Sequence, residues 1–248
     1  METRAHPYSP SDFMDDTGSI AKEMTLAEIK QVVKDFGSAA EICKRCSADA
    51  VEIHAAHGYL LSQFLSPYYN KRNDKYGGSI ENRFRIVEEV YLSIRAHVGK
   101  DFPIMIKLNY EDLVQPGFIG DECVFVCKRL EELGINGIEI SSGLAISPIS
   151  LPFQKPNNPM SGTFTNGALE VASKVNVPVI SVGGYRSLDG IEAVLNEGNI
   201  SAFSVSRPLI CEPDLISKWL KGDTRISKCI SCNKCFLGVY GCKVFHNN

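Results

Sequence analysis

The sequence contains no apolar run that approaches the roughly 18 residues of a membrane-spanning helix. Its first ten residues, METRAHPYSP, lack the apolar core that a secretory signal peptide requires. Basic side chains are not in excess either, because 26 lysines and arginines stand against 29 aspartates and glutamates, a net charge of -3. Proteins that bind nucleic acid usually carry a clustered basic surplus. We therefore expect neither a membrane nor nucleic acid as a partner, and we expect a cytoplasmic protein.

The composition that is present suits a globular enzyme, with 248 residues of which 44% are hydrophobic and 22% are charged. This length is enough for one large domain or two small ones. Along the chain, short apolar segments typical of strands alternate with amphipathic segments typical of helices, which predicts parallel strands joined by right-handed crossovers. The predicted strands are 48–56, 103–109, 137–143, 177–184 and 202–208, and the predicted helices are 25–46, 79–99, 121–134, 166–175, 187–198 and 214–222.

Five strands fit two architectures. An open doubly wound sheet accommodates five, whereas a closed (β/α)8 barrel, or TIM barrel, needs eight, so that three would be absent. In both architectures the working residues lie at the carboxyl ends of the strands. Here these ends carry polar side chains or glycines, namely His54 and His57, Lys107 and Asn109, Ser141 and Ser142, Gly183 and Gly184, and Ser206 and Arg207.

The last two strand ends have the residues that a phosphate group needs. Gly183 and Gly184 allow close approach of backbone N–H groups, and the following helix adds a partial positive charge. Arg207, next to Ser206, can bind two phosphate oxygens at once. Barrels often bind phosphate at strands seven and eight, so these two strands would be the last of eight.

The first strand end carries the pattern H-x-x-H-x-Y, formed by His54, His57 and Tyr59. One interpretation is zinc ligation in a hydrolase or aldolase, although the sequence offers no third ligand nearby. A second is a structural pair. A third is a pair of hydrogen-bond donors that bind a carbonyl or phenolate oxygen as negative charge builds on it. A tyrosine, with an ordinary pKa of about 10, would then keep a proton to give to a neighbouring carbon at neutral pH.

Four of the nine cysteines lie within the last twenty residues, at Cys229, Cys232, Cys235 and Cys242. In a reducing compartment, the tight spacing C-x-x-C-x-x-C indicates a metal or an iron–sulfur cluster rather than disulfides. A zinc-binding or vestigial knuckle is the alternative. The other five, at positions 43, 46, 123, 127 and 211, are scattered along the chain.

The long stretch HAAHGYLLSQFLSPYYNKRNDKYGGSIENRFR, which starts at His54, resembles the Old Yellow Enzyme family of FMN-dependent ene-reductases, in particular the bacterial branch near 2,4-dienoyl-CoA reductase. The segments GIEISSG, PVISVGGYRS and SVSRPLICEPDL continue the resemblance, which runs from about residue 20 to 222. It implies a (β/α)8 barrel that contains FMN and takes hydride from NAD(P)H. The implied substrates are small molecules with an activated C=C bond, such as enones or enoyl thioesters.

The resemblance also implies roles for single residues. His54 and His57 would hold the activating oxygen of the substrate, and Tyr59 would donate the proton. Lys107 would lie beside the pyrimidine edge of the flavin, where family members more often have arginine. The phosphate of FMN would be held by Gly183, Gly184, Ser206 and Arg207. The loop RNDKYGGS is expected to be structural, and Arg72, Asp74 and Asn82 would hold it in place before the helix that follows.

Family members begin with three further strand–helix stretches, which this chain lacks. We therefore expect an incomplete barrel with strands four to eight, divided into a lead-in segment (1–24), the FMN-binding part (25–222) and a Cys-rich tail (223–248). The open edges of such a barrel predict self-association. The alternative function is that of a barrel fragment that binds flavin weakly or not at all and acts only with another chain.

The segment CISCNKC is similar to the start of the iron–sulfur motif of larger members, which implies a 4Fe–4S cluster.

Overall fold

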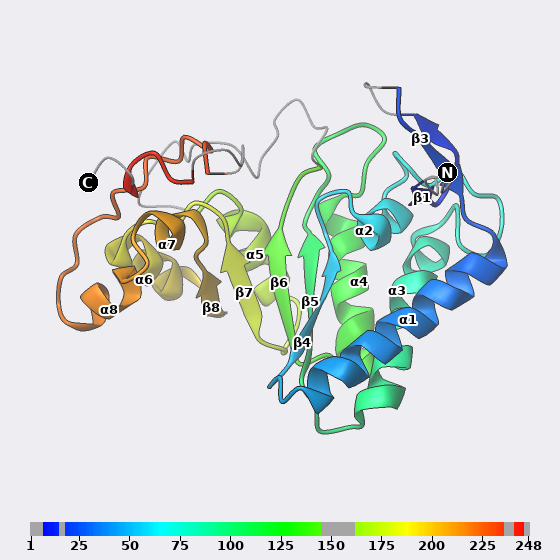
Figure 1. The fold of residues 1–248 in the computed structure, drawn as a ribbon, viewed down its shortest axis with the longest axis horizontal. Helices are drawn as coiled ribbons and strands as arrows, with labels where there is room; N and C mark the ends of the chain where they lie inside the picture. The colour runs from blue at the N-terminus through cyan, green and yellow to red at the C-terminus, as the bar shows by residue number, and fades with distance from the viewer. Residues whose placement is uncertain (1–6, 15–17, 145–161, 236–240, 246–248) are drawn as a thin grey trace, which may run out of the picture.

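The computed structural model describes residues 7–14, 18–144, 162–235 and 241–245. Its centre is a five-stranded parallel sheet in the order β4-β5-β6-β7-β8 (Figure 1). Every strand pairs with the next one along the chain, as in a barrel, whereas a doubly wound sheet reverses its order at a switch point. The expectation of an α/β fold that forms strands four to eight of a (β/α)8 barrel is therefore confirmed. The strands are β4 (Val51–Ala55), β5 (Ile104–Asn109), β6 (Gly137–Ser141), β7 (Val179–Val182) and β8 (Ile200–Ser204).

Helices pack against one face of this sheet. Alternate side chains of the strands point to this face, and Ile104, Ile106 and Ile138 are fully buried there in one core with the apolar side of the helices. The polar residues at the strand ends lie on the opposite, concave face. The long helices are α1 (Leu26–Arg45), α3 (Ile80–Val98), α4 (Gly120–Leu133), α5 (Thr165–Ala172) and α6 (Leu188–Glu197).

Helix ends follow from local chemistry. Thr25 and Glu28 form a capping box at the start of α1, in which each side chain accepts a hydrogen bond from the backbone of the other. Ser79 occupies the predicted N-cap position of α3, where its hydroxyl contacts the carboxylate of Glu81. Helix α4 ends at Gly134, whose φ of 90° is the left-handed conformation that glycine adopts without strain.

One predicted element was wrong at its end. The segment 202–208 was expected to be a strand throughout, but β8 ends at Ser204, and Arg207 begins the short helix α7 (Arg207–Cys211). Pro208 explains this, because a proline in the first helical turn needs no hydrogen bond for its missing N–H. The sequence analysis also missed the short helix α2 (Leu60–Leu65) and three short strands, β1 (Tyr8–Ser9), β2 (Phe13–Met14) and β3 (Ile20–Glu23), whereas the predicted last helix is α8 (Leu215–Leu220).

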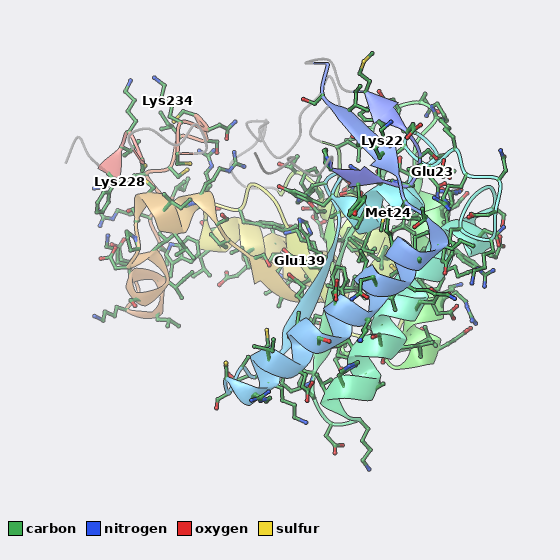
Figure 2. All side chains as sticks on the ribbon, turned by 45° about the vertical axis from the view of Figure 1, so that its right-hand side comes forward. Lys22, Glu23, Met24, Glu139, Lys228 and Lys234 are labelled. Carbon is green, nitrogen blue, oxygen red and sulfur yellow. The ribbon has the colours of Figure 1, made fainter. Side chains whose placement is uncertain are left out.

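The loop RNDKYGGS has the structural role that was expected. Arg72 pairs with Asp74 and donates through Nη1 to the backbone oxygens of Pro10 (2.8 Å) and Met24 (2.7 Å). It thereby ties the loop to the small sheet β1-β3-β2, next to the labelled Glu23 and Met24 in Figure 2. Asn82 donates to the backbone oxygen of Gly77 and holds the end of the loop against α3.

The sheet is open in the part of the chain that the structure describes, since β4 and β8 each pair on one side only. The same residues contain no helix that is long and apolar enough to cross a membrane. Parts of the predicted lead-in segment (1–24) and of the predicted tail (223–248) lie outside the described residues, and the domain division stays a prediction.

Candidate active site

A cavity of about 440 Å³ opens at the carboxyl ends of the strands, on the concave side of the sheet. It is lined by residues from β4 to β8 and from the loops that follow them. The structure thus brings together every residue that the sequence analysis placed at a catalytic or flavin site, namely His54, His57, Tyr59, Lys107, Gly183, Gly184, Ser206 and Arg207.

The substrate-side residues of the prediction form one cluster. The ring centroids of His54 and His57 are 5.4 Å apart, and those of His54 and Tyr59 are 4.9 Å apart. Tyr59 stands at the start of α2 and is 60% exposed, so its hydroxyl is accessible from the cavity mouth. Three side chains that can donate hydrogen bonds therefore converge at one end of the cavity.

His57 is held from two neighbouring strands. Its backbone has a φ of 63°, which is unusual for a residue with a side chain, and its N–H donates to Oδ1 of Asn109 (3.1 Å) at the end of β5. Its Nε2 lies 2.6 Å from Oγ of Ser141 at the end of β6. These two contacts fix the position and the orientation of the imidazole ring.

Both histidines are neutral at pH 7. Burial, and then the positive charge of Lys107, lower the pKa of His57 to about 4. The same two causes lower the pKa of His54. A neutral imidazole carries one N–H, so each ring can donate one hydrogen bond without bringing a full positive charge into the site.

Lys107, which lines the cavity, forms an ion pair with a residue of the neighbouring strand. Its Nζ lies 3.1 Å from Oε1 of Glu139, which stands opposite it on β6. Glu139 was not singled out from the sequence. An acidic residue at the centre of GIEIS, between two isoleucines of a short predicted strand, was the signal that could have identified it.

The other end of the cavity has two arginines. Arg207 donates to Oδ1 of Asn233, and Arg186 donates to the backbone oxygen of Cys229 (2.8 Å). The Nε atom of Arg186 is buried and has no hydrogen-bond partner within the described part of the chain. Arg186 was missed in the sequence analysis, although it follows directly on the glycine pair. A buried donor without an acceptor, beside a second guanidinium, fits an anionic group such as a phosphate.

The two glycines leave the backbone accessible at this end. Gly183 has a φ of 109°, and a Cβ there would lie 2.7 Å from the ring of Phe164. Gly184 has a φ of 85°. Only glycine suits either position, and a side chain would close the space next to the arginines.

The four tail cysteines line a second, smaller cavity that Arg207 also borders. Cys211, which the sequence analysis counted among the scattered cysteines, contacts the thiol of Cys242. Within the described residues, however, no group of three or more histidines, cysteines or acidic side chains is placed to hold a metal ion. Within the same residues, His54 and His57 therefore have no third ligand placed to complete a zinc site. Ligation by Cys229, Cys232, Cys235 and Cys242 stays a prediction.

Comparison with known proteins agrees with the sequence resemblance. An NADH oxidase of Thermoanaerobacter brockii is 37% identical over 231 residues, which are 93% of this chain and 35% of that protein. A solved complex of 2-naphthoyl-CoA reductase with 2-naphthoyl-CoA is 29% identical, with a TM-score of 0.86 over 96% of this chain and 37% of that one. Morphinone reductase (24% identity, TM-score 0.69, 88% of this chain and 60% of that one) shares the fold.

The chain thus spans about a third of the length of the NADH oxidase and of the naphthoyl-CoA reductase. The family model described as "NADH:flavin oxidoreductase / NADH oxidase family" matches residues 1–224, nearly the whole chain. The chain belongs to the NADH:flavin oxidoreductase / NADH oxidase family of FMN-dependent oxidoreductase enzymes.

Proposed function

We propose that the cavity binds FMN and that the protein reduces activated C=C bonds with NAD(P)H. The observation that carries this proposal is the convergence, on one cavity of about 440 Å³, of all eight residues predicted for the catalytic and flavin sites. A cavity of this size, with a few converging polar groups, is typical of a small-molecule site. The naphthoyl-CoA reductase, whose name describes the reduction of an acyl-CoA thioester with an aromatic group, supports a substrate of the enone or enoyl thioester class.

The arginine end of the cavity would hold the phosphate of FMN. Arg186 and Arg207 supply charge and oriented donors, and the exposed backbone at Gly183 and Gly184 allows close approach. Ser206 also lines the cavity. Lys107 also lines the cavity, and the resemblance assigns it to the pyrimidine edge of the flavin.

The histidine end would hold the substrate. Bound FMN, once reduced by NAD(P)H, supplies the hydride for the β-carbon of the alkene. His54 and His57 donate hydrogen bonds to the carbonyl oxygen, on which negative charge develops as the hydride arrives. The hydroxyl of Tyr59 then donates its proton to the α-carbon. Because both imidazoles are neutral, they polarise the carbonyl without protonating it first.

For the tail we propose a 4Fe–4S cluster at Cys229, Cys232, Cys235 and Cys242. The support is the C-x-x-C-x-x-C spacing and the shared small cavity. The described positions of the thiols do not form a metal site, so binding would require them to close in, and no step of the reaction above is assigned to a cluster. The same thiols favour the cytoplasm, where they stay reduced.

A second candidate is a barrel part that acts only with another polypeptide. The observation that favours it is the pair of open sheet edges at β4 and β8 within the described residues. Unpaired strand edges pair readily with other chains. We propose that the chain alone self-associates, which sedimentation at several concentrations would show as a mass that rises with concentration. A concentration-independent monomer that binds FMN fully would contradict this second candidate.

The test of the main proposal is titration of the purified chain with FMN, followed by the change in flavin absorbance and fluorescence. We expect saturable binding that Arg186→Ala and Arg207→Ala each weaken at least about tenfold, since each removes a charge-assisted hydrogen bond. Arg225→Ala is the matched control, because Arg225 is an exposed arginine that pairs with Asp223 and does not line the cavity. Equal affinity in all four proteins, or no saturable binding at all, would contradict the assignment of the cavity to FMN.

A further inference from the structure

A segment of the tail, residues 227–233, lies against the arginine end of the main cavity. Ser227, Cys229 and Ser231 in this segment are buried, whereas the two residues between them are exposed. Such an alternation is typical of an extended chain, with one side packed on the protein and the other side in solvent. Figure 2 labels Lys228, one of the exposed residues. The roles proposed above use only the two cysteines of this segment.

The first residues of segment 227–233 are fixed to the rest of the fold by hydrogen bonds. The Ser227 hydroxyl and the Lys228 N–H both donate to Oε2 of Glu212, at 2.8 and 2.6 Å, just after α7. The backbone N–H of Ser227 donates to the backbone oxygen of Arg186 (2.8 Å), just after β7. The segment is therefore held between the loops that follow β7 and α7, and none of these bonds uses a cysteine side chain.

From this position the segment contacts both arginines of the main cavity. Nη1 of Arg186 donates to the backbone oxygen of Cys229 (2.8 Å), and Nη1 of Arg207 donates to Oδ1 of Asn233. Ser231, which lies between these two acceptors in the chain, lines both the main cavity and the small cavity of the cysteines. A guanidinium has five N–H donors, so each arginine keeps further donors for an anion while the segment restrains its orientation.

We propose that segment 227–233 is part of the anion site, because it positions Arg186 and Arg207 for a phosphate group in the main cavity. Asn233 is then a positioning residue, since it does not line the main cavity and acts through Arg207. Because an anion restrains the same two arginines, anion binding and the ordering of the segment are coupled, and the coupling is reciprocal. The inference rests on the proposed function for the identity of the anion as FMN, but inorganic phosphate tests the coupling without a flavin.

The backbone at Asn233 permits a substitution that removes only the side chain. Asn233 has a φ of 61°, in the left-handed region that glycine adopts without strain. Asn233→Gly therefore deletes the acceptor of Arg207 and keeps the backbone conformation. Ser47→Gly is the matched control, because Ser47 has a φ of 63°, is exposed and does not line the main cavity.

The first measurement compares the affinities for FMN and for riboflavin, which has the same ring system but no phosphate. Asn233→Gly should weaken the binding of FMN at least about fivefold, since Arg207 loses a hydrogen bond that orients it. The binding of riboflavin should not change, and Ser47→Gly should leave both affinities as they are. An unchanged affinity for FMN in Asn233→Gly, or an equal loss for both flavins, would overturn the positioning role of Asn233.

The second measurement is amide hydrogen exchange of segment 227–233, with and without saturating inorganic phosphate or FMN. Either ligand should slow exchange in the segment at least about fivefold, the lower end of typical coupling between two sites. Residues 46–50, at the end of α1, are the internal control and should exchange at an unchanged rate.

The slower exchange should be lost in Asn233→Gly, whereas direct cover of Ser231 by the ligand would slow exchange in both proteins alike. Slower exchange with phosphate in a chain that binds no flavin would refute the proposed function and retain the coupling. Exchange that neither ligand changes, or that both proteins slow equally, would overturn the inference.

Discussion

The Nε2 atom of His57 lies 2.6 Å from Oγ of Ser141, although 84 positions separate the two residues in the chain. The contact exists because β4 and β6 place their carboxyl ends at the same edge of the sheet. His57 stands in the left-handed region of φ, which few residues with a side chain adopt. The contact with Ser141 restrains the side-chain torsions of His57 and therefore the direction in which the ring points.

Replacement of Ser141 by alanine should loosen the His57 ring. We expect alkene reduction by the FMN-loaded chain to slow about tenfold, which corresponds to the loss of one hydrogen bond of roughly 1.4 kcal/mol. Reduction of the flavin by NAD(P)H should change little. Stopped-flow absorbance measures the two half-reactions separately. Ser142→Ala is the matched control, because Ser142 is also buried but does not line the cavity. Equal rates in Ser141→Ala and Ser142→Ala would show that the contact has no role in the reaction.

Replacement of Tyr59 by phenylalanine should slow the oxidation of the reduced flavin by an alkene by about 10²–10⁴-fold, the usual contribution of a general acid. The hydroxyl acts only in this half-reaction, so reduction by NAD(P)H should stay nearly normal. Tyr59 is 60% exposed, and loss of its hydroxyl should not disturb the fold. An unchanged oxidation rate would remove Tyr59 from the mechanism.

The pKa shifts of His57 and Glu52 should affect stability in opposite directions. Between about pH 6.5 and pH 4, His57 is protonated in the unfolded chain but neutral in the folded chain. The free energy of unfolding therefore falls as the pH drops through this window. The effect is at most about 3 kcal/mol by linkage. Glu52 instead keeps its proton up to about pH 7 in the folded chain, whereas it loses the proton near pH 4.5 in the unfolded chain. Partial burial, and then the negative charge of Glu139, raise its pKa in the folded chain. The contribution of Glu52 to the free energy of unfolding therefore falls as the pH rises.

Urea unfolding between pH 4.5 and 7.5 would separate the two contributions. The free energy of unfolding should rise more steeply with pH in Glu52→Gln than in the unmodified chain, and less steeply in His57→Gln. Parallel curves for all three proteins would contradict the assigned directions.

Protein prepared without oxygen should contain iron and acid-labile sulfide if the tail cysteines hold a cluster. Cys232→Ser should abolish both. Cys43→Ser is the control, because Cys43 is an exposed thiol on α1 and distant in the chain from the tail. Zinc in place of iron, or free thiols at all four positions, would make the tail a structural element. Elemental analysis and the sulfide assay decide between these results.

The residues at the strand ends could be predicted from the sequence because topology determines their place. In a parallel sheet the end of each strand reaches the same edge, so His54, Lys107 and Gly183 had to lie near one another once the strands were recognised. The predicted strand 202–208 ran too far, because it included Arg207, which begins a helix. A short apolar segment fits a strand and a buried helix equally well, so its pattern did not show where the strand ended.

The residues that the sequence analysis missed have contacts with residues that are distant in the sequence. Arg186 looked like an ordinary loop residue, and only the fold shows its buried, unpartnered Nε beside the cavity. Glu139 and Glu52 lie in different strands, 87 positions apart in the numbering, and their contact follows from side-chain packing beneath the cavity. Likewise, the contact of Cys211 with Cys242 links a short helix to the tail. No local pattern encodes these pairs.

In the proposed function, flavin and substrate share one cavity, and His54 and His57 bind the oxygen of the substrate. The most direct measurement is the visible spectrum of the FMN-loaded chain during titration with a simple phenol, whose oxygen mimics the charged oxygen of the substrate. We predict a new long-wavelength charge-transfer band that is lost in His54→Ala and retained in the control Arg225→Ala. A phenol that leaves the flavin spectrum unchanged, or tightly bound zinc that His54→Ala releases, would contradict the account and favour a metal-dependent enzyme.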